Sequence, residues 1–248
     1  QAVAGVAKID HIVESPEAMA GEVDAVLFTR DDIARHYEMA LPFLKARIPL
    51  YMDKVMTHDA VTLAQFLAAA GPDYPIMTAS SFRFAPEVER LRQRLKPGCL
   101  RALHAVSPNV WVRYAPHLID PILDLAAAPV HRVRAIGDDA GTTAILEHAN
   151  GVVATLQVME TLNLPIRIDC FGNAPQEPDR ADYTDSGLES YFTSIVRMLA
   201  EFVRRVTEHD FTRAEFERSV HLNRIVIAAL ESRADDGRPV EITTQENI

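Results

Sequence analysis

The sequence has few cysteines, few basic residues relative to acidic ones and no long apolar run, and each shortage narrows the class of protein. Two cysteines, Cys99 and Cys170, are too few for a disulfide framework. No stretch approaches the ~20 apolar residues of a membrane-spanning helix, and residues 1–19 lack the basic start and apolar run of a secretory signal. The formal charge of −10 argues against a surface for nucleic acid or anionic membrane. We therefore expect a cytoplasmic protein with neither of these partners.

Glycine is also scarce, and its spacing is informative. None of the ten glycines stands two positions from another, so the sequence contains no G-x-G. A doubly wound nucleotide-binding domain normally begins with a strand, a glycine-rich turn and a helix whose N-terminus receives a pyrophosphate. That phosphate-binding turn is absent from the sequence.

Residues 23–98 nevertheless resemble the middle of such a domain, because β-prone apolar runs alternate there with helical patterns. Pro42 stands inside the first helical pattern and should kink or break it. The alternation predicts a parallel sheet covered by helices. The expected strands cover 23–28, 48–52 and 74–80, and the expected helices cover 32–46, 57–70 and 86–95.

An isolated half-sheet of this kind would expose one apolar strand edge. Three explanations compete. The N-terminal segment is deleted or lies outside the sequence given, a partner chain completes the domain, or the protein is a degenerate relative that binds no nucleotide.

The second half has a different pattern, in which short β-prone runs follow one another. Asn150-Gly151 between two of them is the strongest hairpin signal in the sequence. The expected strands cover 104–112, 131–136, 143–148, 152–159 and 166–171, the expected helices cover 114–127, 188–206 and 213–232, and 174–185 is expected to be a loop. We predict an α/β partial Rossmann domain with a doubly wound parallel sheet over residues 1–98. An α+β domain with a large, mostly antiparallel, open-faced sheet follows over residues 99–248.

Four segments, in this order, resemble motifs of the Gfo/Idh/MocA family of nicotinamide-dependent oxidoreductases. They are residues 23–26 followed by Thr29, then 36–54, 81–87 and 114–120. Arg47, Asp53 and Val55 stand where the family has Gly, Glu and Pro. The order and spacing of the segments carry the resemblance, which spans nearly the whole chain but lacks the family's glycine-rich N-terminal segment.

The resemblance implies hydride transfer between NAD or NADP and a hydroxyl or carbonyl of a sugar, cyclitol or similar polyol. Lys54 follows an apolar strand, where open α/β sheets bind ligands, and its ammonium can stabilise charge on a substrate oxygen. His117 is the candidate for exchanging the proton, because imidazole titrates near neutral pH. The structural alternatives are a solvated pair between Lys54 and Asp53, and a histidine bonded to backbone at a helix start.

The candidate site therefore has catalytic, substrate-binding and cofactor-binding members. The catalytic candidates are Lys54 and His117, the substrate contacts are Arg83, Arg113, Tyr114 and Asp120, and the cofactor contacts are Thr29, Asp53 and Lys54. Arg113 replaces an aspartate of many family members; it cannot be an acid–base partner, but it can bind an anionic group. His36 and His58 are expected at the surface or as caps. No metal site is expected, because no histidine pair has metal-ligand spacing.

The resemblance also implies a substrate-binding and oligomerisation role for residues 99–248, with a homodimer or homotetramer formed through the sheet. The rival hypothesis is a non-catalytic binding or scaffold relative without cofactor, favoured by the absent glycine turn, Val55 and Arg113. A hydrolase or lyase that retains a nucleotide is a third reading. The choice between NAD and NADP depends on a residue of the missing segment.

Overall fold

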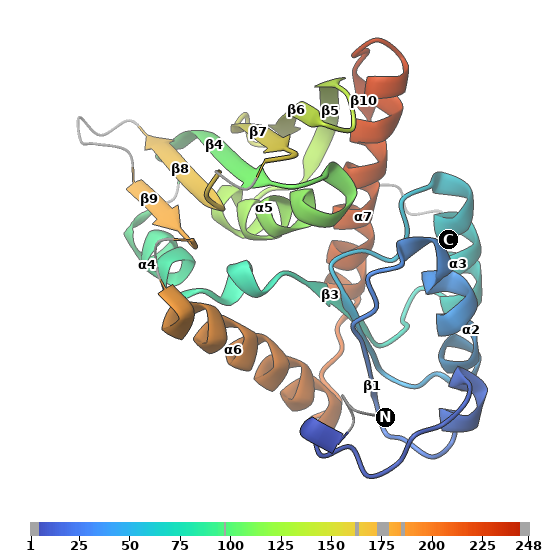
Figure 1. Ribbon diagram of the computed structural model, residues 1–248. Helices are drawn as coiled ribbons and strands as arrows, with labels where there is room; N and C mark the ends of the chain where they lie inside the picture. Colours follow the sequence, from blue (N-terminus) through green and yellow to red (C-terminus); the bar gives the residue numbers. More distant parts are fainter. Residues whose placement is uncertain (1–4, 97, 162–163, 173–178, 185–186, 244–248) are drawn as a thin grey trace.

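The computed structural model describes residues 5–96, 98–161, 164–172, 179–184 and 187–243, and its strands form two sheets (Figure 1). Short helical turns η1, η2 and η3 cover Pro16–Met19, Ile33–Arg35 and Ser81–Phe84. The first sheet contains three parallel strands in the order β1 (Val26–Phe28), β2 (Leu50–Asp53) and β3 (Ile76–Ala79). This confirms the parallel sheet predicted from the alternating pattern, although β1 begins three residues later than expected.

The helices that connect these strands are α2 (His36–Ala46) and α3 (Ala60–Ala70). The prediction that Pro42 breaks the first one is wrong, because α2 runs on through it. The missing proline N–H leaves one helix hydrogen bond unmade. Arg47 ends α2 with φ of 53°, a left-handed conformation that glycine adopts at lower cost. Asp59 caps α3 by accepting from the Thr62 N–H at 2.7 Å.

The two faces of the small sheet are covered by different helices. Val26, Phe28 and Met52 pack with α2, α3 and the last helix, α7 (Arg213–Ala234). Tyr51 and Met77, on the other face, pack against α6 (Gly187–Thr207).

The two edges of the same sheet also differ. At the β3 edge, Ser219 of α7 accepts the Thr78 N–H at 3.0 Å. At the β1 edge no strand pairs with β1 among the described residues, and Leu27 is 50% exposed. At the β3 edge a side chain of α7 therefore accepts a backbone N–H, whereas the β1 edge has no neighbouring strand among the described residues.

The second sheet has seven strands in the order β10-β5-β6-β7-β4-β8-β9. They are β4 (Leu100–Pro108), β5 (Val130–Gly137), β6 (Gly141–His148), β7 (Val153–Met159), β8 (Arg167–Gly172), β9 (Asp179–Asp182) and β10 (Val240–Glu241). Only the β4–β7 pair among these is parallel, so the predicted mostly antiparallel sheet is confirmed. Gly151 adopts φ of 82° between β6 and β7, as the hairpin prediction requires.

Part of the predicted loop at 174–185 is instead the strand β9, which pairs with β8; residues 173–178 and 185–186 lie outside the described residues. The misprediction arose because the polar sequence of β9 matches an edge strand whose partner is visible only in the fold.

Helix α4 (Pro86–Arg94) leads from β3 of the small sheet to β4 of the large sheet, and α5 (Trp111–Ala126) connects β4 to β5 within the large sheet. In Figure 1, α5 lies under the large sheet, and α7 runs between the two sheets and contacts both β3 and β5. α7 therefore contributes to both cores. No helix within the described ranges is both long and apolar enough to cross a membrane.

Candidate active site

The candidate site forms where the carboxyl ends of β1, β2 and β3 meet the first turns of α5. Asp53 ends β2, and Lys54 follows it with φ of 70°. Such a φ value is uncommon for a residue other than glycine, so the turn directs the Lys54 side chain in a way that regular strand geometry would not. The predicted position of Lys54 at a strand end is therefore confirmed.

The Lys54 ammonium lies between two carboxylates. Its Nζ is 3.1 Å from Asp53 Oδ2 and 3.3 Å from Asp31 Oδ1, and 18% of the side chain is exposed. Burial alone would lower the pKa of Lys54, but Asp53 and Asp31 outweigh it and raise that pKa above its ordinary value. Lys54 is therefore protonated at neutral pH, and the two carboxylates hold its ammonium in place.

His117 is half-buried in the first half of α5, and its ring is fixed on two sides. Nδ1 lies 2.7 Å from Ser80 Oγ, and the Tyr114 ring meets the imidazole edge to face, with 5.4 Å between centroids. Burial, and then the nearby positive charge of Lys54, lower the pKa of His117 to about 4, against a smaller opposing effect of Asp53. At neutral pH the ring is therefore uncharged.

The predicted substrate contact Asp120 lies behind His117 and is completely buried. Its Oδ2 accepts the Ser80 backbone N–H at 2.8 Å, and its Oδ1 accepts from Arg218 Nη2 at 2.6 Å. The carboxylate thus anchors the turn that presents Ser80 to His117.

Arg83 belongs to the same buried network. Its guanidinium lies 3.2 Å from Asp124, 3.7 Å from Asp120 and 3.6 Å from Glu215, and 15% of its side chain is exposed. These carboxylates hold its pKa above the ordinary arginine value despite the burial that opposes it. Arg83 therefore forms ion pairs with these three carboxylates.

The remaining predicted residues lie on α5 and directly after β1. Arg113, 47% exposed, lies 3.6 Å from Asp31 Oδ2, so Asp31 joins Arg113 to Lys54. Tyr114 is half-buried beside His117, and Thr29 is exposed directly after β1. Asp31 was not predicted from the sequence, because its only signal there is its place in the loop after a strand.

Two buried polar residues that join the site loops were also mispredicted or missed. His36 is 1% exposed, which contradicts the expectation of a surface or capping residue. Its ring nitrogens lie 2.9 Å from the carbonyls of Arg30 and Val55, in the loops after β1 and β2. Asn223 of α7 accepts from the Met56 N–H at 2.7 Å and donates to the Thr57 carbonyl at 2.9 Å. The loop after Lys54 is therefore held from two sides.

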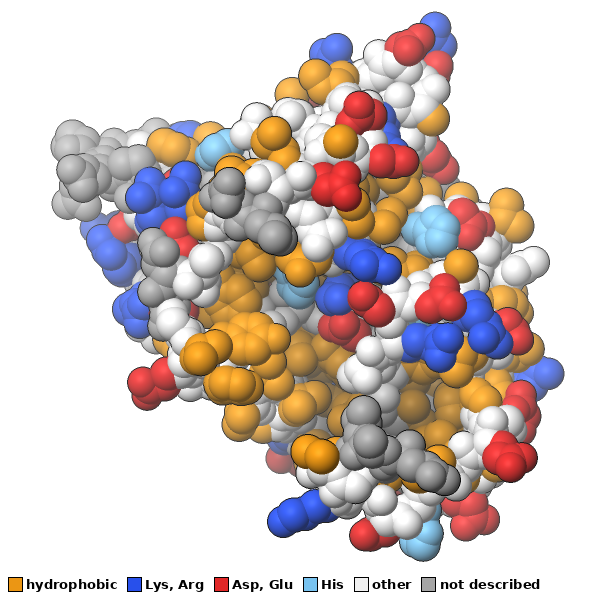
Figure 2. All heavy atoms as spheres, viewed as in Figure 1, with side chains coloured by type: hydrophobic (Ala, Val, Ile, Leu, Met, Phe, Trp, Pro, Cys, Tyr) orange, Lys and Arg blue, Asp and Glu red, His pale blue; other side chains and the backbone are white. Residues whose placement is uncertain are grey.

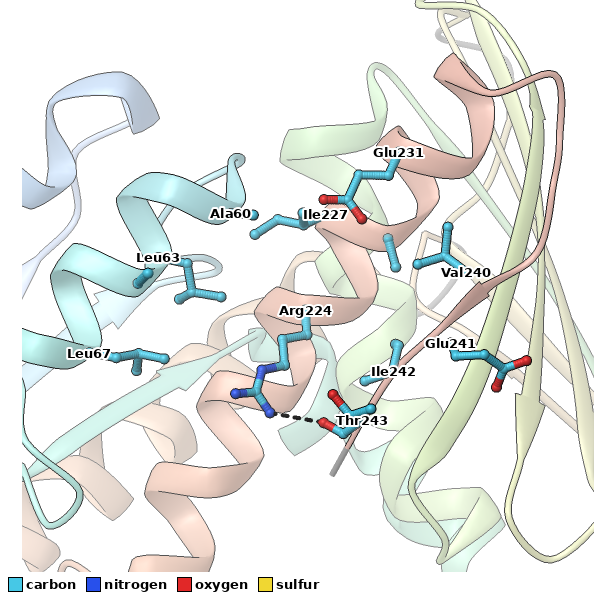
Figure 3. Close-up of a pocket in the computed structure, with 12 residues that line it drawn as sticks. Ala60, Leu63, Leu67, Arg224, Ile227, Glu231, Val240, Glu241, Ile242 and Thr243 are labelled. Atoms are coloured by element: carbon cyan, nitrogen blue, oxygen red, sulfur yellow. Dashed lines mark hydrogen bonds between the residues drawn. The ribbon is translucent and has the colours of Figure 1, made fainter. Parts of the chain in front are cut away.

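Two other surface features lie away from this site. A groove of about 250 Å³ lies between α3, α7 and β10, where Arg224 donates to the Thr243 carbonyl at 3.2 Å (Figure 3). It shares no lining residue with the Lys54–His117 site. Figure 2 shows apolar side chains gathered over α6, consistent with the exposure of Leu188, Phe192 and Val196. Nowhere in the described part of the chain do three or more His, Cys, Asp or Glu side chains form a possible metal site.

The arrangement can be compared with known proteins. No family model matches the chain, and no curated protein matches it. Solved structures do match. A probable dehydrogenase from Thermotoga maritima aligns with a TM-score of 0.78 at 16% identity, over 97% of this chain and 88% of that one. Myo-inositol 2-dehydrogenase from Lactobacillus plantarum aligns with a TM-score of 0.76 at 14% identity, over 97% and 87%. GenD2 from gentamicin A biosynthesis, in complex with NAD, aligns with a TM-score of 0.75 at 17% identity, over 98% and 85%.

The chain therefore has the fold of these dehydrogenases: a parallel-sheet unit of Rossmann type followed by a unit with a large mixed sheet. This is the fold expected from the resemblance to the Gfo/Idh/MocA family, and that expectation is confirmed.

Proposed function

We propose that the protein is an NAD(P)-dependent oxidoreductase, which transfers a hydride between the nicotinamide and a hydroxyl or carbonyl of a sugar, cyclitol or similar polyol. The observation that carries this proposal is the pair of Lys54 and His117 at the carboxyl end of a parallel sheet. The Lys54 ammonium is paired with Asp53 at the end of β2, and the His117 ring contacts Ser80 directly after the neighbouring strand β3. The fold is that of dehydrogenases, one of which was solved with NAD.

The nicotinamide cofactor would supply or receive the hydride, and the protein would manage charge and protons at the substrate oxygen. The Lys54 ammonium, held by Asp53 and Asp31, would stabilise negative charge on that oxygen. Either Lys54 or His117 would exchange the proton, and the resemblance to the Gfo/Idh/MocA family implies His117 for this step. Asp53 would keep the ammonium in place.

The chain's residues fit one end of the cofactor. Thr29, Asp53 and Lys54 follow the ends of β1 and β2, where open α/β sheets bind ligands, and Thr29 is exposed. These residues would contact the nicotinamide and its ribose. The sequence given supplies no glycine-rich turn for the pyrophosphate.

The predicted substrate contacts divide by exposure. We propose that Arg113 and Tyr114, which reach the surface beside the site, touch the substrate directly. Asp120 and Arg83 would act on it through Ser80 and the buried ion pairs. An anionic group on the substrate would compete with Asp31 for Arg113.

A non-catalytic relative is the second candidate function. The observation in its favour is that Arg113, where many family members have an aspartate, is paired with Asp31 beside Lys54. Such a protein would bind a sugar-like ligand without turnover.

The test is a titration of the purified protein with NADH and with NADPH, followed by cofactor fluorescence. Saturable binding in the micromolar range, together with turnover of a polyol that Lys54→Ala abolishes, would support the oxidoreductase. A folded protein that binds neither nucleotide would contradict it and leave the non-catalytic relative. A comparison of the two dissociation constants decides between NAD and NADP.

Three further proposals concern the whole chain. We propose a homodimer or homotetramer that pairs the outer faces of the large sheets, where Ile136, Val153, Met159 and Phe171 are each at least 38% exposed.

We propose a functional division near residue 98, with α7 shared by both parts. We also propose a cytoplasmic protein, in keeping with Cys99 and Cys170 both being free.

A further inference from the structure

The position of Ser80, directly after β3, is fixed through both its backbone and its side chain. The residue is 1% exposed. Its N–H donates to Asp120 Oδ2 at 2.8 Å, and its Oγ accepts from the Phe82 N–H at 3.1 Å. The same Oγ lies 2.7 Å from Nδ1 of His117. The hydroxyl therefore has little freedom to choose other partners.

The hydrogen count at Oγ decides the direction of its bond to His117. A serine hydroxyl has one hydrogen and two acceptor lone pairs. The Phe82 N–H occupies one lone pair. Among the described residues, Nδ1 of His117 is the acceptor within hydrogen-bond distance of the hydroxyl hydrogen. If Nδ1 carried a hydrogen, the Ser80 hydrogen would be left without a partner in a buried place, which costs free energy. The hydroxyl therefore donates to Nδ1.

The ring must then carry its hydrogen on the other nitrogen. Burial and Lys54 lower the pKa of His117 to about 4, so the ring has one hydrogen at neutral pH. With Nδ1 accepting from Ser80, that hydrogen belongs to Nε2. Nε2 makes no hydrogen bond to the residues that the structure describes, so it is free to donate to a ligand.

We propose that Ser80 is a positioning residue that holds His117 as the Nε2–H tautomer, so that His117 donates a hydrogen bond to the substrate oxygen and Lys54 exchanges the proton. The catalytic meaning of this assignment rests on the proposed oxidoreductase function. In carbonyl reduction, a reduced nicotinamide would supply the hydride to the carbonyl carbon and would itself be oxidised. The C–O π electron pair would move to oxygen, and a Lys54 N–H bond would give its proton to that oxygen. The resulting amine is reprotonated by water. In oxidation each transfer is reversed.

This assignment reverses the roles expected from the sequence, where His117 was the group that exchanges the proton. The site would contain two donors to one oxygen, which is the arrangement that stabilises developing negative charge. Lys54 faces Asp31, Asp53 and His117, and the two carboxylates keep it protonated in the resting state.

The first test is the tautomer itself, read by two-bond ¹H–¹⁵N correlation on ¹⁵N-histidine-labelled protein without cofactor at neutral pH. The protein has nine histidines, and the His117 signals are assigned as those that disappear in His117→Gln. We expect an unprotonated Nδ1 and a protonated Nε2. Ser80→Ala should move both resonances toward a tautomer mixture, and Ser80→Thr should restore them.

Ser81→Ala is the matched control, because Ser81 lies in the same turn and its hydroxyl contacts Tyr183 instead. It should leave the His117 resonances unchanged. A protonated Nδ1 in the unmodified protein, or identical spectra for it and Ser80→Ala, would overturn the inference. If Ser80→Ala does not fold, the spectrum of the unmodified protein still decides the tautomer.

The second test is the pH profile of kcat/KM for alcohol oxidation. If Lys54 accepts the proton, the rate should keep rising between about pH 5 and 9 as more amine forms. A profile that is flat over that range would indicate a base already unprotonated, such as His117, and would overturn the assignment. Ser80→Ala should lower kcat/KM about 10-fold, less than the 10²–10³ of removing a donor outright. Failure to bind nucleotide contradicts the proposed function alone, because the tautomer measurement needs no nucleotide.

Discussion

Arg218 donates to the carboxylate of Asp120 at 2.6 Å, although the two residues are 98 positions apart in the chain. Arg218 lies on α7 and Asp120 on α5, and the Asp120 carboxylate is completely buried. Because the same carboxylate holds the Ser80 N–H, the last helix of the chain is connected through Asp120 to the turn beside His117. The site thus depends on a buried ion pair rather than on local sequence.

The first prediction concerns this ion pair. Asp120→Ala would remove the fully buried carboxylate that Arg218, Arg83 and the Ser80 N–H share. Arg218 would keep Asp124, and Arg83 would keep Asp124 and Glu215, so we expect a loss of about 3 kcal/mol in the free energy of unfolding, the lower end of the range for breaking a buried pair. Urea unfolding followed by circular dichroism measures it. The control is Glu217→Gln, which breaks the exposed pair of Arg213 and Glu217 on α7 and should cost less than about 1 kcal/mol. Equal losses in the two variants would contradict the importance of burial.

The second prediction concerns the charge of Lys54 and its effect on His117. Lys54→Gln removes the ammonium that depresses the pKa of His117, so that pKa should rise from about 4 toward its ordinary value. It should remain below that value, because burial is the larger cause. Histidine NMR titration gives the result, with Lys45→Gln on the exposed side of α2 as control. In an active preparation, Lys54→Gln should lower kcat/KM by about 10²–10³.

The third prediction is acid sensitivity of the fold. Burial, with nearby Arg224 and His148, lowers the pKa of His221 to about 4, and His117 behaves similarly. An unfolded histidine binds its proton near pH 6.5. Because the folded groups resist protonation, their stabilisation is complete above that pH and decreases as the pH falls toward 4. The loss reaches up to about 3 kcal/mol per group.

Urea unfolding at several pH values measures this loss. His221 Nε2 accepts the Val130 N–H at 3.0 Å, and Gln can supply an acceptor there without titrating. His221→Gln should therefore flatten the decline between about pH 6.5 and 4.5. An unchanged slope would show that other groups cause the acid sensitivity.

The fourth prediction concerns the loop that follows Lys54. The fully buried Asn223 amide satisfies the N–H groups of Met56 and Thr57 and the Thr57 carbonyl. Asn223→Leu would leave these groups without partners, at about 1–3 kcal/mol each. We expect lower stability and faster hydrogen exchange at Met56 and Thr57. Unchanged exchange at these two amides would show that the loop is held by other contacts.

Much of the fold could be predicted from the sequence because its signals are local. The apolar runs of β2 and β3 are buried on both faces, as strands of a parallel sheet must be, and so they read as continuous apolar segments. Asn150-Gly151 fixed one hairpin of the large sheet through turn chemistry alone. The polar strand β9 was missed, since its identity depends on pairing with β8.

The candidate site was only partly accessible in the same way. Lys54 and His117 were predicted from motifs that resemble those of the Gfo/Idh/MocA family, and their places at a strand end and a helix start agreed with that prediction. Ser80, Asp31 and Asn223 were not found, because their partners lie 37, 23 and 167 positions away. His36 was expected at the surface or as a cap, since nothing in its sequence neighbours shows that two loop carbonyls contact its ring.

The sequence by itself determined the order of most strands and helices and the two kinds of sheet, because periodicity and turn residues act between near neighbours. The two ionisable groups of the candidate site were predicted from the order and spacing of motifs along the chain. Tertiary structure decided the charge state of those groups and the hydrogen-bond partners that orient them. The pKa of His117 depends on burial and on Lys54, and its orientation depends on a serine at the end of another strand. Such properties arise only when distant segments exclude water together, so no local pattern encodes them.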